Sequence, residues 1–567
     1  MTAPTAPRAA SGDFAAAGAW TRRGPVDLPG PEGDNSIARE PLWYAYGAGD
    51  DAPEAPAWTW VPQPPPDTHV PPPPPRGGGP REPLPLGTHD RLTALPYPAL
   101  PGPLGSDDRP AAERYASRPN PAPRPDGRPH PLPAPSPAGR GAAEPVADRL
   151  GRALVTAFGP QRREPENPYN DHRPYASPRC LFPVHAFVDG GAGMPWRLLE
   201  PDRHALTGAP AAPARNVVLT GRYTSVPPAY QWFRGSLIAI ELGFVLRALS
   251  LGLELFDVPA RLRLPGRDAH RLLPALGLDD AWAWSLPFVV ELDGGGVPAH
   301  AGHAPPEPPA QEGHAPPEPP DHLPRTDPAL AALIRVNREQ TYGGAAAPLT
   351  TAVPADLAPS AIAPDWAELL WRRHSGRMPR ALHGMSGRRR TVPAEALDSA
   401  ARWLSVPPPG PELAAAFEAL KVTAVVQRVS GRTDGVHLLR DGAAHLLRAD
   451  PAAPRRLEER YGYGLSPVNG CGIHDAPLTV FLSVRTRELF ERLGTAGWGA
   501  VQHAAGWAAH GLCLSAAASG LFARPVRAFK EIPTQRVLGL DPDEMIVLSV
   551  VVGVPQDTGG ALLDLRL

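Results

Sequence analysis

The chain has 567 residues, of which 42% are hydrophobic and 80 are proline, whereas proline usually makes up ~5% of a sequence. This length is enough for several domains, and the net charge of −2 gives no overall field that would attract nucleic acid or an anionic membrane. The sequence has no apolar run of roughly 18 residues and no basic N-terminal segment followed by an apolar one, so it predicts neither membrane insertion nor a signal peptide.

The first segment, residues 1–146, is rich in Pro, Gly, Ala and Arg. We expect it to be mostly disordered, because it cannot bury enough apolar surface to offset the entropy of the chain. Residues 41–60 are different, since they contain Trp43, Tyr44, Tyr46, Trp58 and Trp60. This aromatic patch docks either on the folded body of its own chain or on a partner, and the sequence leaves both interpretations open.

The composition changes at Ala147, and residues 147–292 have the pattern of a folded unit. Residues 235–253 are apolar on nearly every side, interrupted by Glu241 and Arg247, which is typical of a buried helix. The remaining patterns predict a helix at residues 147–159, strands at 180–188, 216–223 and 286–292, and a strand–turn–strand at 196–206.

A linker follows at residues 293–328. The sequence GHAPPEPP occurs at residues 302–309 and again at 313–320. Repeated Pro-Pro-Glu indicates a stiff, solvated polyproline spacer. Recognition by a proline-binding domain is the alternative.

The last segment, residues 329–567, repeats much of the first unit. It has its own apolar helix at residues 494–521, followed by a Leu-Gly-Leu-Asp tetrapeptide and an apolar strand, as in the first unit. Its other patterns predict helices at 365–379 and 394–404 and strands at 421–431, 435–450 (with a turn at 440–443) and 477–484. We therefore predict two diverged copies of one domain, each built around a central buried helix.

Candidate chemistry is limited to a few positions. The nucleotide-binding, serine-hydrolase, zinc-protease and zinc-finger motifs are absent, and we predict no metal site. The basic turn from Arg372 to Arg377 has three guanidiniums and a hydroxyl that could bind a phosphate, or it is simply a solvated helix end. Tyr223 and Tyr230 flank the entrance to the first central helix, where a phenol serves either as an acid/base group or as a packing residue.

The set of segments resembles a tandem nitroreductase-fold protein of the SagB type, the flavin-dependent oxidoreductases that aromatise azolines in ribosomal peptide natural products. The similar segments are RPYASPRCLFPVHAF (173–187), GRYTSVPPAYQWF (221–233), LWRRHSGRMPRAL (370–382) and the closing helix and strand of the second copy. The resemblance implies an α+β flavodehydrogenase fold with FMN between two copies that form a pseudo-dimer.

The resemblance also implies roles for individual residues. Arg372, Arg373 and Ser375 would hold the phosphate of FMN, Ser177 would touch the flavin, and Tyr230 would be the acid/base group. The sequence departs from the family at the flavin loop, where two glycines are replaced by Pro178 and Arg179 and a glutamate by His185. It also departs at the Lys-Tyr pair, where Ala229 replaces the lysine.

Two functions follow from this reading. The first is an FMN-dependent oxidoreductase acting on a peptide or a small natural-product intermediate. The second is a degenerate, non-catalytic scaffold of the same fold that binds a biosynthetic partner protein or a leader peptide.

The three cysteines lack CxxC spacing, which is typical of a protein in a reducing cytoplasm. The sequence leaves open whether the tandem chain forms a homodimer.

Overall fold

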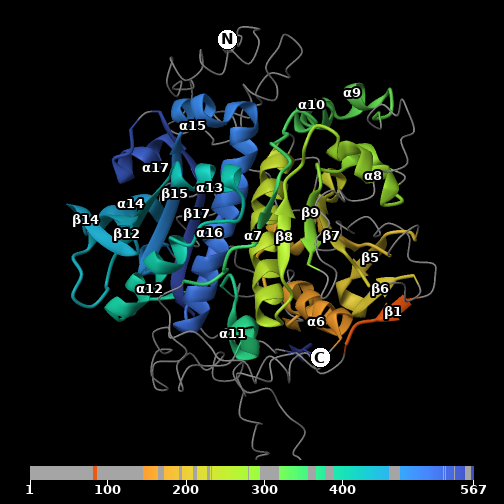
Figure 1. Cartoon of the computed structure of the whole chain (residues 1–567). Coiled ribbons are helices and arrows are strands. Elements are labelled where there is room, and N and C mark those ends of the chain that lie inside the picture. Colours follow the sequence, from red (N-terminus) through yellow and green to blue (C-terminus); the bar gives the residue numbers. More distant parts are fainter. Residues whose placement is uncertain are drawn as a thin grey trace, which may run out of the picture.

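The structure is a computed structural model in which two β-sheets flank a central layer of helices (Figure 1). It describes residues 81–85, 145–163, 171–190, 194–208, 213–226, 230, 233–278, 280–293, 318–354, 366–376, 387–458, 473–527, 529, 531–541, 543–555 and 563–566. The aromatic patch at residues 41–60 and most of the proline-rich repeat lie outside these residues.

The first sheet has eight strands in the order β1-β6-β5-β4-β7-β9-β8-β10, all antiparallel. Its strands are β1 (Arg81–Pro83), β4 (Val184–Val188), β5 (Arg197–Glu200), β6 (Ala205–Thr207), β7 (Asn216–Gly221), β8 (Ala260–Arg263), β9 (Phe288–Leu292) and β10 (Ala346–Pro348). Helices α6 (Val146–Phe158) and α7 (Phe233–Leu255) cover its inner face, while α8 (Leu272–Ala275) packs with the cluster around Trp284.

The second sheet has seven strands, with β16 pairing beside the path β11-β17-β15-β12-β13-β14. Its strands are β11 (Gly387–Arg388), β12 (Leu420–Val426), β13 (Gly435–Arg440), β14 (Ala443–Ala449), β15 (Leu478–Arg485), β16 (Phe522–Val526) and β17 (Glu544–Pro555). The remaining helices are α9 (Leu323–Thr326), α10 (Pro328–Asn337), α11 (Trp366–Arg372), α12 (Ala394–Leu404), α13 (Pro411–Glu418), α14 (Ala453–Glu458), α15 (Thr486–Leu493), α16 (Gly497–Ala518) and α17 (Glu531–Leu538). Of these, α9 and α10 lie on the side of the first sheet, near α8 (Figure 1).

The two sheets share one strand order. The path β6-β5-β4-β7-β9 in the first sheet corresponds to β14-β13-β12-β15-β17 in the second. In both halves the central helix comes after the fourth strand of that path, which is β7 before α7 and β15 before α16. After each central helix comes a strand, β8 or β16, that pairs with the last strand. This is the arrangement that a duplication of one domain predicts.

Short strands from outside residues 147–292 complete the first half. β1 lies within the segment predicted to be mostly disordered, yet it pairs with β6 and is held by ion pairs of Arg81 with Glu200 and of Glu82 with Arg197. β10 lies beyond the predicted boundary at residue 329 and pairs with β8. Both occupy edges of the sheet, where unpaired backbone groups accept any extended segment of the chain.

The C-terminus also returns to the first half. β18 (Leu563–Asp564) pairs with β2 (Arg162–Arg163), which pairs with β3 (Asp171–His172). Three segments from outside residues 147–292, which are β1, β10 and β18, therefore pair with strands of the first half.

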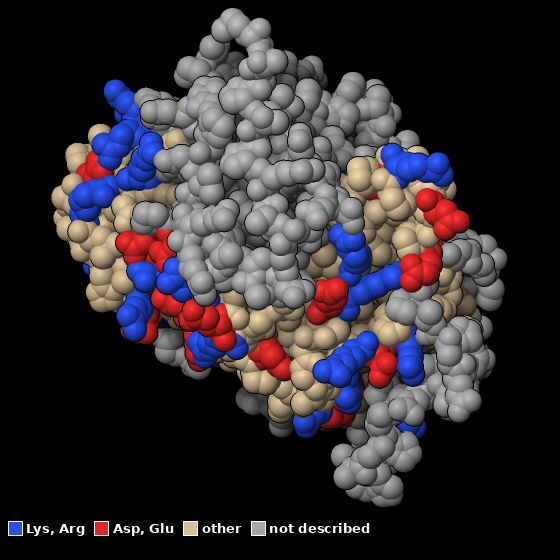
Figure 2. Space-filling view, turned by 90° about the horizontal axis from the view of Figure 1, so that it is seen from above, with Lys and Arg blue, Asp and Glu red and all other residues tan. Residues whose placement is uncertain are grey.

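The core is continuous between the two halves. α7 and α16 pack against each other in the middle of the molecule, and one cluster of buried side chains extends from Leu84 to Val554. α7 is long and apolar enough to cross a membrane by composition, but 89% of its most apolar window is buried inside the protein. Among the residues drawn in colour in Figure 2, acidic and basic side chains are interspersed on the face seen from above.

Candidate functional site

The basic turn after α11 meets the predicted flavin loop of the other copy. Arg373 is only 3% exposed, and its Nη2 donates to the carbonyl oxygen of Arg173 at 3.0 Å. Its Nη1 lies 3.5 Å from Oγ of Ser375. Two segments that are 200 residues apart in the sequence are therefore in contact across the two copies.

The loop that begins at Arg173 is held by an internal network. Oγ of Ser177 donates to Oε2 of Glu241 at 2.6 Å and accepts the backbone N–H of Phe182 at 2.9 Å. The guanidinium of Arg173 lies 4.1 Å from the centre of the Phe182 ring. Cys180 and Phe182 both have positive φ, at 54° and 48°, and such strain in residues other than glycine persists only where the surroundings enforce it.

Glu241 fixes this loop from the central helix. Its side chain lies at the buried face of α7, and the residue is 1% exposed. Burial raises the pKa of Glu241 to about 8. The hydrogen bonds from Ser177 and from the backbone N–H of Val184, together with the positive charge of Arg173, act in the opposite direction and only partly offset this effect. In the sequence, Glu241 interrupts an otherwise apolar helix, and this interruption is the signal that could have indicated its role.

Two other predicted site residues, Arg372 and Tyr230, make contacts elsewhere. Nε of Arg372 donates to Oε1 of Glu368 at 2.8 Å, one turn earlier on α11, so this guanidinium is already engaged. Tyr230 precedes α7, with its ring 6.4 Å from that of Phe233. Phe233 and Glu241 lie eight residues apart on α7, which separates them by about 12 Å along the helix.

The other candidate phenol, Tyr223, lines a small cavity near the first turns of the two central helices. The cavity has a volume of about 30 Å³, and Gly235, Gln340, Gly499 and His503 also contribute to its wall. This volume suits about one water molecule. Oε1 of Gln340 is buried without a hydrogen-bond partner among the described residues, so a water here would satisfy it.

Two buried basic side chains were not identified as site residues from the sequence. Arg247 on α7 and His510 on α16 are both 0% exposed. Burial, with the positive charges of Arg247 and Arg373, holds the pKa of His510 well below its ordinary value, so the imidazole is neutral. Both ring nitrogens of His510, and Nε of Arg373, have no hydrogen-bond partner among the described residues.

Comparison with known proteins gives a fold and no closer relative. No protein-family model matches the chain, and a search of curated proteins finds no match. A provisionally assigned nitroreductase from Anabaena variabilis superposes on 72% of this chain and 88% of its own with a TM-score of 0.52, at 15% sequence identity. The chain has the nitroreductase fold. At this identity, the likeness establishes the arrangement of the elements and not the activity.

Two further solved structures match less of the chain. The Escherichia coli microcin synthetase McbBCD complex with truncated pro-MccB17 bound has a TM-score of 0.25 at 12% identity, covering 30% of this chain and 66% of that one. A provisionally assigned nitroreductase from Ralstonia eutropha has a TM-score of 0.25 at 16% identity, covering 37% of this chain and 92% of that one. Matches of this quality carry no argument about function.

No group of three or more His, Cys, Asp or Glu side chains in the described part of the chain is placed to hold a metal ion. The polar groups that converge between the halves are guanidiniums, hydroxyls, an imidazole and a carboxyl. Such a set suits an anionic organic ligand better than a cation.

Proposed function

We propose that this protein is an FMN-dependent oxidoreductase acting on a peptide or a small natural-product intermediate, with SagB-like azoline oxidation as the nearest analogue. The observation that carries the proposal is the contact of Arg373 with the carbonyl of Arg173. The segments around these two residues both resemble flavin-binding segments of the same family, although they are far apart in the sequence. Their meeting across the two halves, in a nitroreductase fold, supports a composite flavin site.

The residues on the second-copy side of this contact fit a phosphate. Arg373 is a buried guanidinium whose Nε has no partner among the described residues, and the hydroxyl of Ser375 lies next to it. An unsatisfied buried donor is costly, typically by about 1–3 kcal/mol, and a phosphate oxygen would satisfy it. In this proposal Arg373 and Ser375 hold the phosphate of FMN, and the bound flavin supplies the hydride acceptor of the reaction.

Two of the predicted flavin ligands, Ser177 and Arg372, have roles in this proposal that differ from those expected from the sequence. Ser177 positions the loop through Glu241 and does not need to touch the flavin, since its hydroxyl already donates and accepts. Arg372 contributes charge near the phosphate while its Nε stays with Glu368. Tyr230 remains the proposed acid/base group, acting without the lysine that Ala229 replaces.

The test is an absorption spectrum of the purified full chain after incubation with FMN and desalting. We expect retained flavin bands in the wild type, their loss in Arg373→Gln, and at most about a threefold weaker affinity in Arg372→Gln, because Arg372 is already paired. Circular dichroism checks that both variants fold. A wild-type protein that stays colourless after this treatment would refute the oxidoreductase proposal.

The second candidate function is the non-catalytic scaffold that binds a partner protein or a leader peptide. It is favoured by the same engagement of Ser177 and Arg372 within the chain, which removes two of the four expected flavin ligands. It predicts a colourless protein whose partner binding survives the double substitution of Arg372 and Arg373. For either function we propose a cytoplasmic protein.

A further inference from the structure

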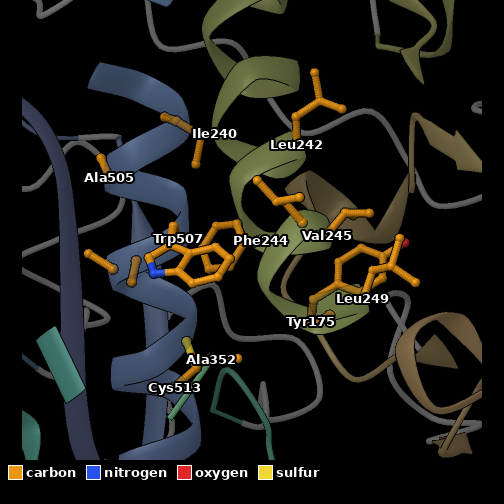
Figure 3. Close-up of a cluster of buried hydrophobic side chains, with 14 of the residues drawn as sticks. Tyr175, Ile240, Leu242, Phe244, Val245, Leu249, Ala352, Ala505, Trp507 and Cys513 are labelled. Carbon is orange, nitrogen blue, oxygen red and sulfur yellow. The ribbon is translucent and has the colours of Figure 1, made fainter. Parts of the chain in front are cut away.

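The two central helices meet in a symmetrical way. Gly243 of α7 and Gly506 of α16 face each other, because a Cβ on Gly243 would lie 2.1 Å from the carbonyl oxygen of His503, and one on Gly506 would lie 2.0 Å from that of Ile240. An aromatic residue follows each glycine, Phe244 on α7 and Trp507 on α16 (Figure 3). Each half of the molecule therefore presents an equivalent place beside the crossing.

The residue four positions after each glycine is basic in both helices. It is Arg247 on α7 and His510 on α16. Arg247 lies 5.2 Å from the ring of Trp507, and His510 packs edge-on against Phe244 at 6.0 Å. The contacts with the partner helix thus match, while the chemistry of the two side chains differs.

The place occupied by Arg247 is filled and satisfied. Its guanidinium donates to the carbonyl oxygens of Ala352 (3.0 and 2.9 Å), Trp507 (2.9 Å) and Trp403 (3.2 Å). The Trp403 ring lies 5.3 Å from its central carbon. A methyl group on Gly511 would lie 2.2 Å from Nη1 of Arg247, so the guanidinium fills the space beside α16 at this point.

The place occupied by His510 has unmet hydrogen-bonding capacity. Neither ring nitrogen of this fully buried imidazole has a partner among the described residues, and the same holds for Nε of Arg373, whose charge acts on His510. A neutral imidazole can donate one hydrogen bond and accept another. Buried polar groups without partners are rare, and a missing ligand or water is an ordinary reason for them.

We infer that the two halves have diverged into one ligand-binding half, at His510 and Arg373, and one sealed half, closed by Arg247 between Trp403 and Trp507, so that each chain binds a single flavin. This inference rests on the proposed function. It specifies the number of flavins per chain and the half in which the flavin is held. It also assigns Arg247 as the residue that replaces a second ligand.

The first test is the binding stoichiometry of the full chain. The protein is saturated with FMN, freed of unbound FMN by desalting, and denatured, and the released FMN is counted against protein. One FMN per chain is the expected result. Two per chain would overturn this inference while leaving the proposed function intact, whereas none would overturn the proposed function and this inference together.

The second test locates the single flavin. We expect His510→Leu to weaken FMN binding at least tenfold, and His510→Gln, which keeps a donor and an acceptor, to lose much less. Urea denaturation of each variant provides the control, because a merely structural role would lower stability in both without separating their affinities. Equal FMN affinity in His510→Leu and the wild type would overturn the placement of the site.

Discussion

The close crossing of the two central helices makes Gly506→Ala the sharpest test of the packing. A Cβ at this position would lie 2.0 Å from the carbonyl oxygen of Ile240. An unstrained carbon–oxygen contact is about 3.3 Å, so the helices must part by about 1.3 Å. A gap of this order forfeits about half of the dispersion energy of the contacts that it opens, and no side-chain rotation relieves it because the obstructing atoms are backbone.

The magnitude follows from two opposing contributions. Overpacking against a rigid neighbour costs about 3 kcal/mol, at the upper end of the usual range, and alanine gains about 1 kcal/mol over glycine within a helix. We therefore expect Gly506→Ala to lower the free energy of unfolding by about 2 kcal/mol, measured by urea denaturation followed by tryptophan fluorescence. The double variant with Gly243→Ala should cost less than the sum of the single ones, because the first substitution already parts the helices.

Gly235→Ala is the matched control, since it makes the same change in the first turns of α7. There the nearest atom to a new Cβ is the end of the Leu333 side chain, at 2.5 Å, which can rotate away. We expect its stability to stay within about 1 kcal/mol of the wild type. If Gly506→Ala proved as stable as Gly235→Ala, the close approach of the helices would be wrong.

Three further predictions concern buried polar groups. Arg247→Lys should lower the free energy of unfolding, measured by urea denaturation, by at least about 2 kcal/mol. The single nitrogen of an ammonium cannot reach the three carbonyl oxygens and two tryptophan rings that the planar guanidinium contacts. A stability equal to the wild type would contradict the described network. Gly511→Ala should be destabilising in the wild type and less so in Arg247→Ala, so a double-mutant cycle should show coupling between these two positions, and additivity would argue against their contact. Burial raises the pKa of Glu241 to about 8 from an ordinary 4.5. Between about pH 4.5 and 8 the folded protein therefore keeps a proton on Glu241 that the unfolded chain loses. The free energy of unfolding consequently falls as pH rises through this window. Glu241→Gln should remove the contribution of Glu241 to this pH dependence, which is at most about 1.4 kcal/mol per pH unit. If the free energies of unfolding of the variant and the wild type, measured at pH 5, 6.5 and 8, changed in parallel, this assignment would be refuted.

The regular elements could be predicted from the sequence because their patterns are local and strong. The helix predicted at residues 235–253 occurs as Phe233–Leu255, and the predicted hairpin turn at residues 440–443 joins β13 to β14. An apolar helix of this length and a hairpin with Asp441-Gly442 at its tip each depend on a few neighbouring residues.

The site could be predicted only in part, since its decisive contacts are distant in sequence. The Arg372–Arg373 pair was recognised, but the sequence could not show that Glu368 engages the first arginine and leaves the second for the loop at Arg173. The role of Glu241 was missed for the same reason, because its partner Ser177 lies 64 residues away. Spacing along the chain reveals residue types, whereas the fold decides which of them meet.

The shared core has a consequence for the order in which the chain is made. α7 is complete at Leu255, but the helix that covers it, α16, begins only at Gly497. At the usual rate of synthesis, of about 5–20 residues per second, these roughly 240 residues take about ten to fifty seconds. During that interval the most apolar helix of the protein is on the ribosome-bound chain without its partner, so the nascent first half is the stage at which we expect chaperones to be needed.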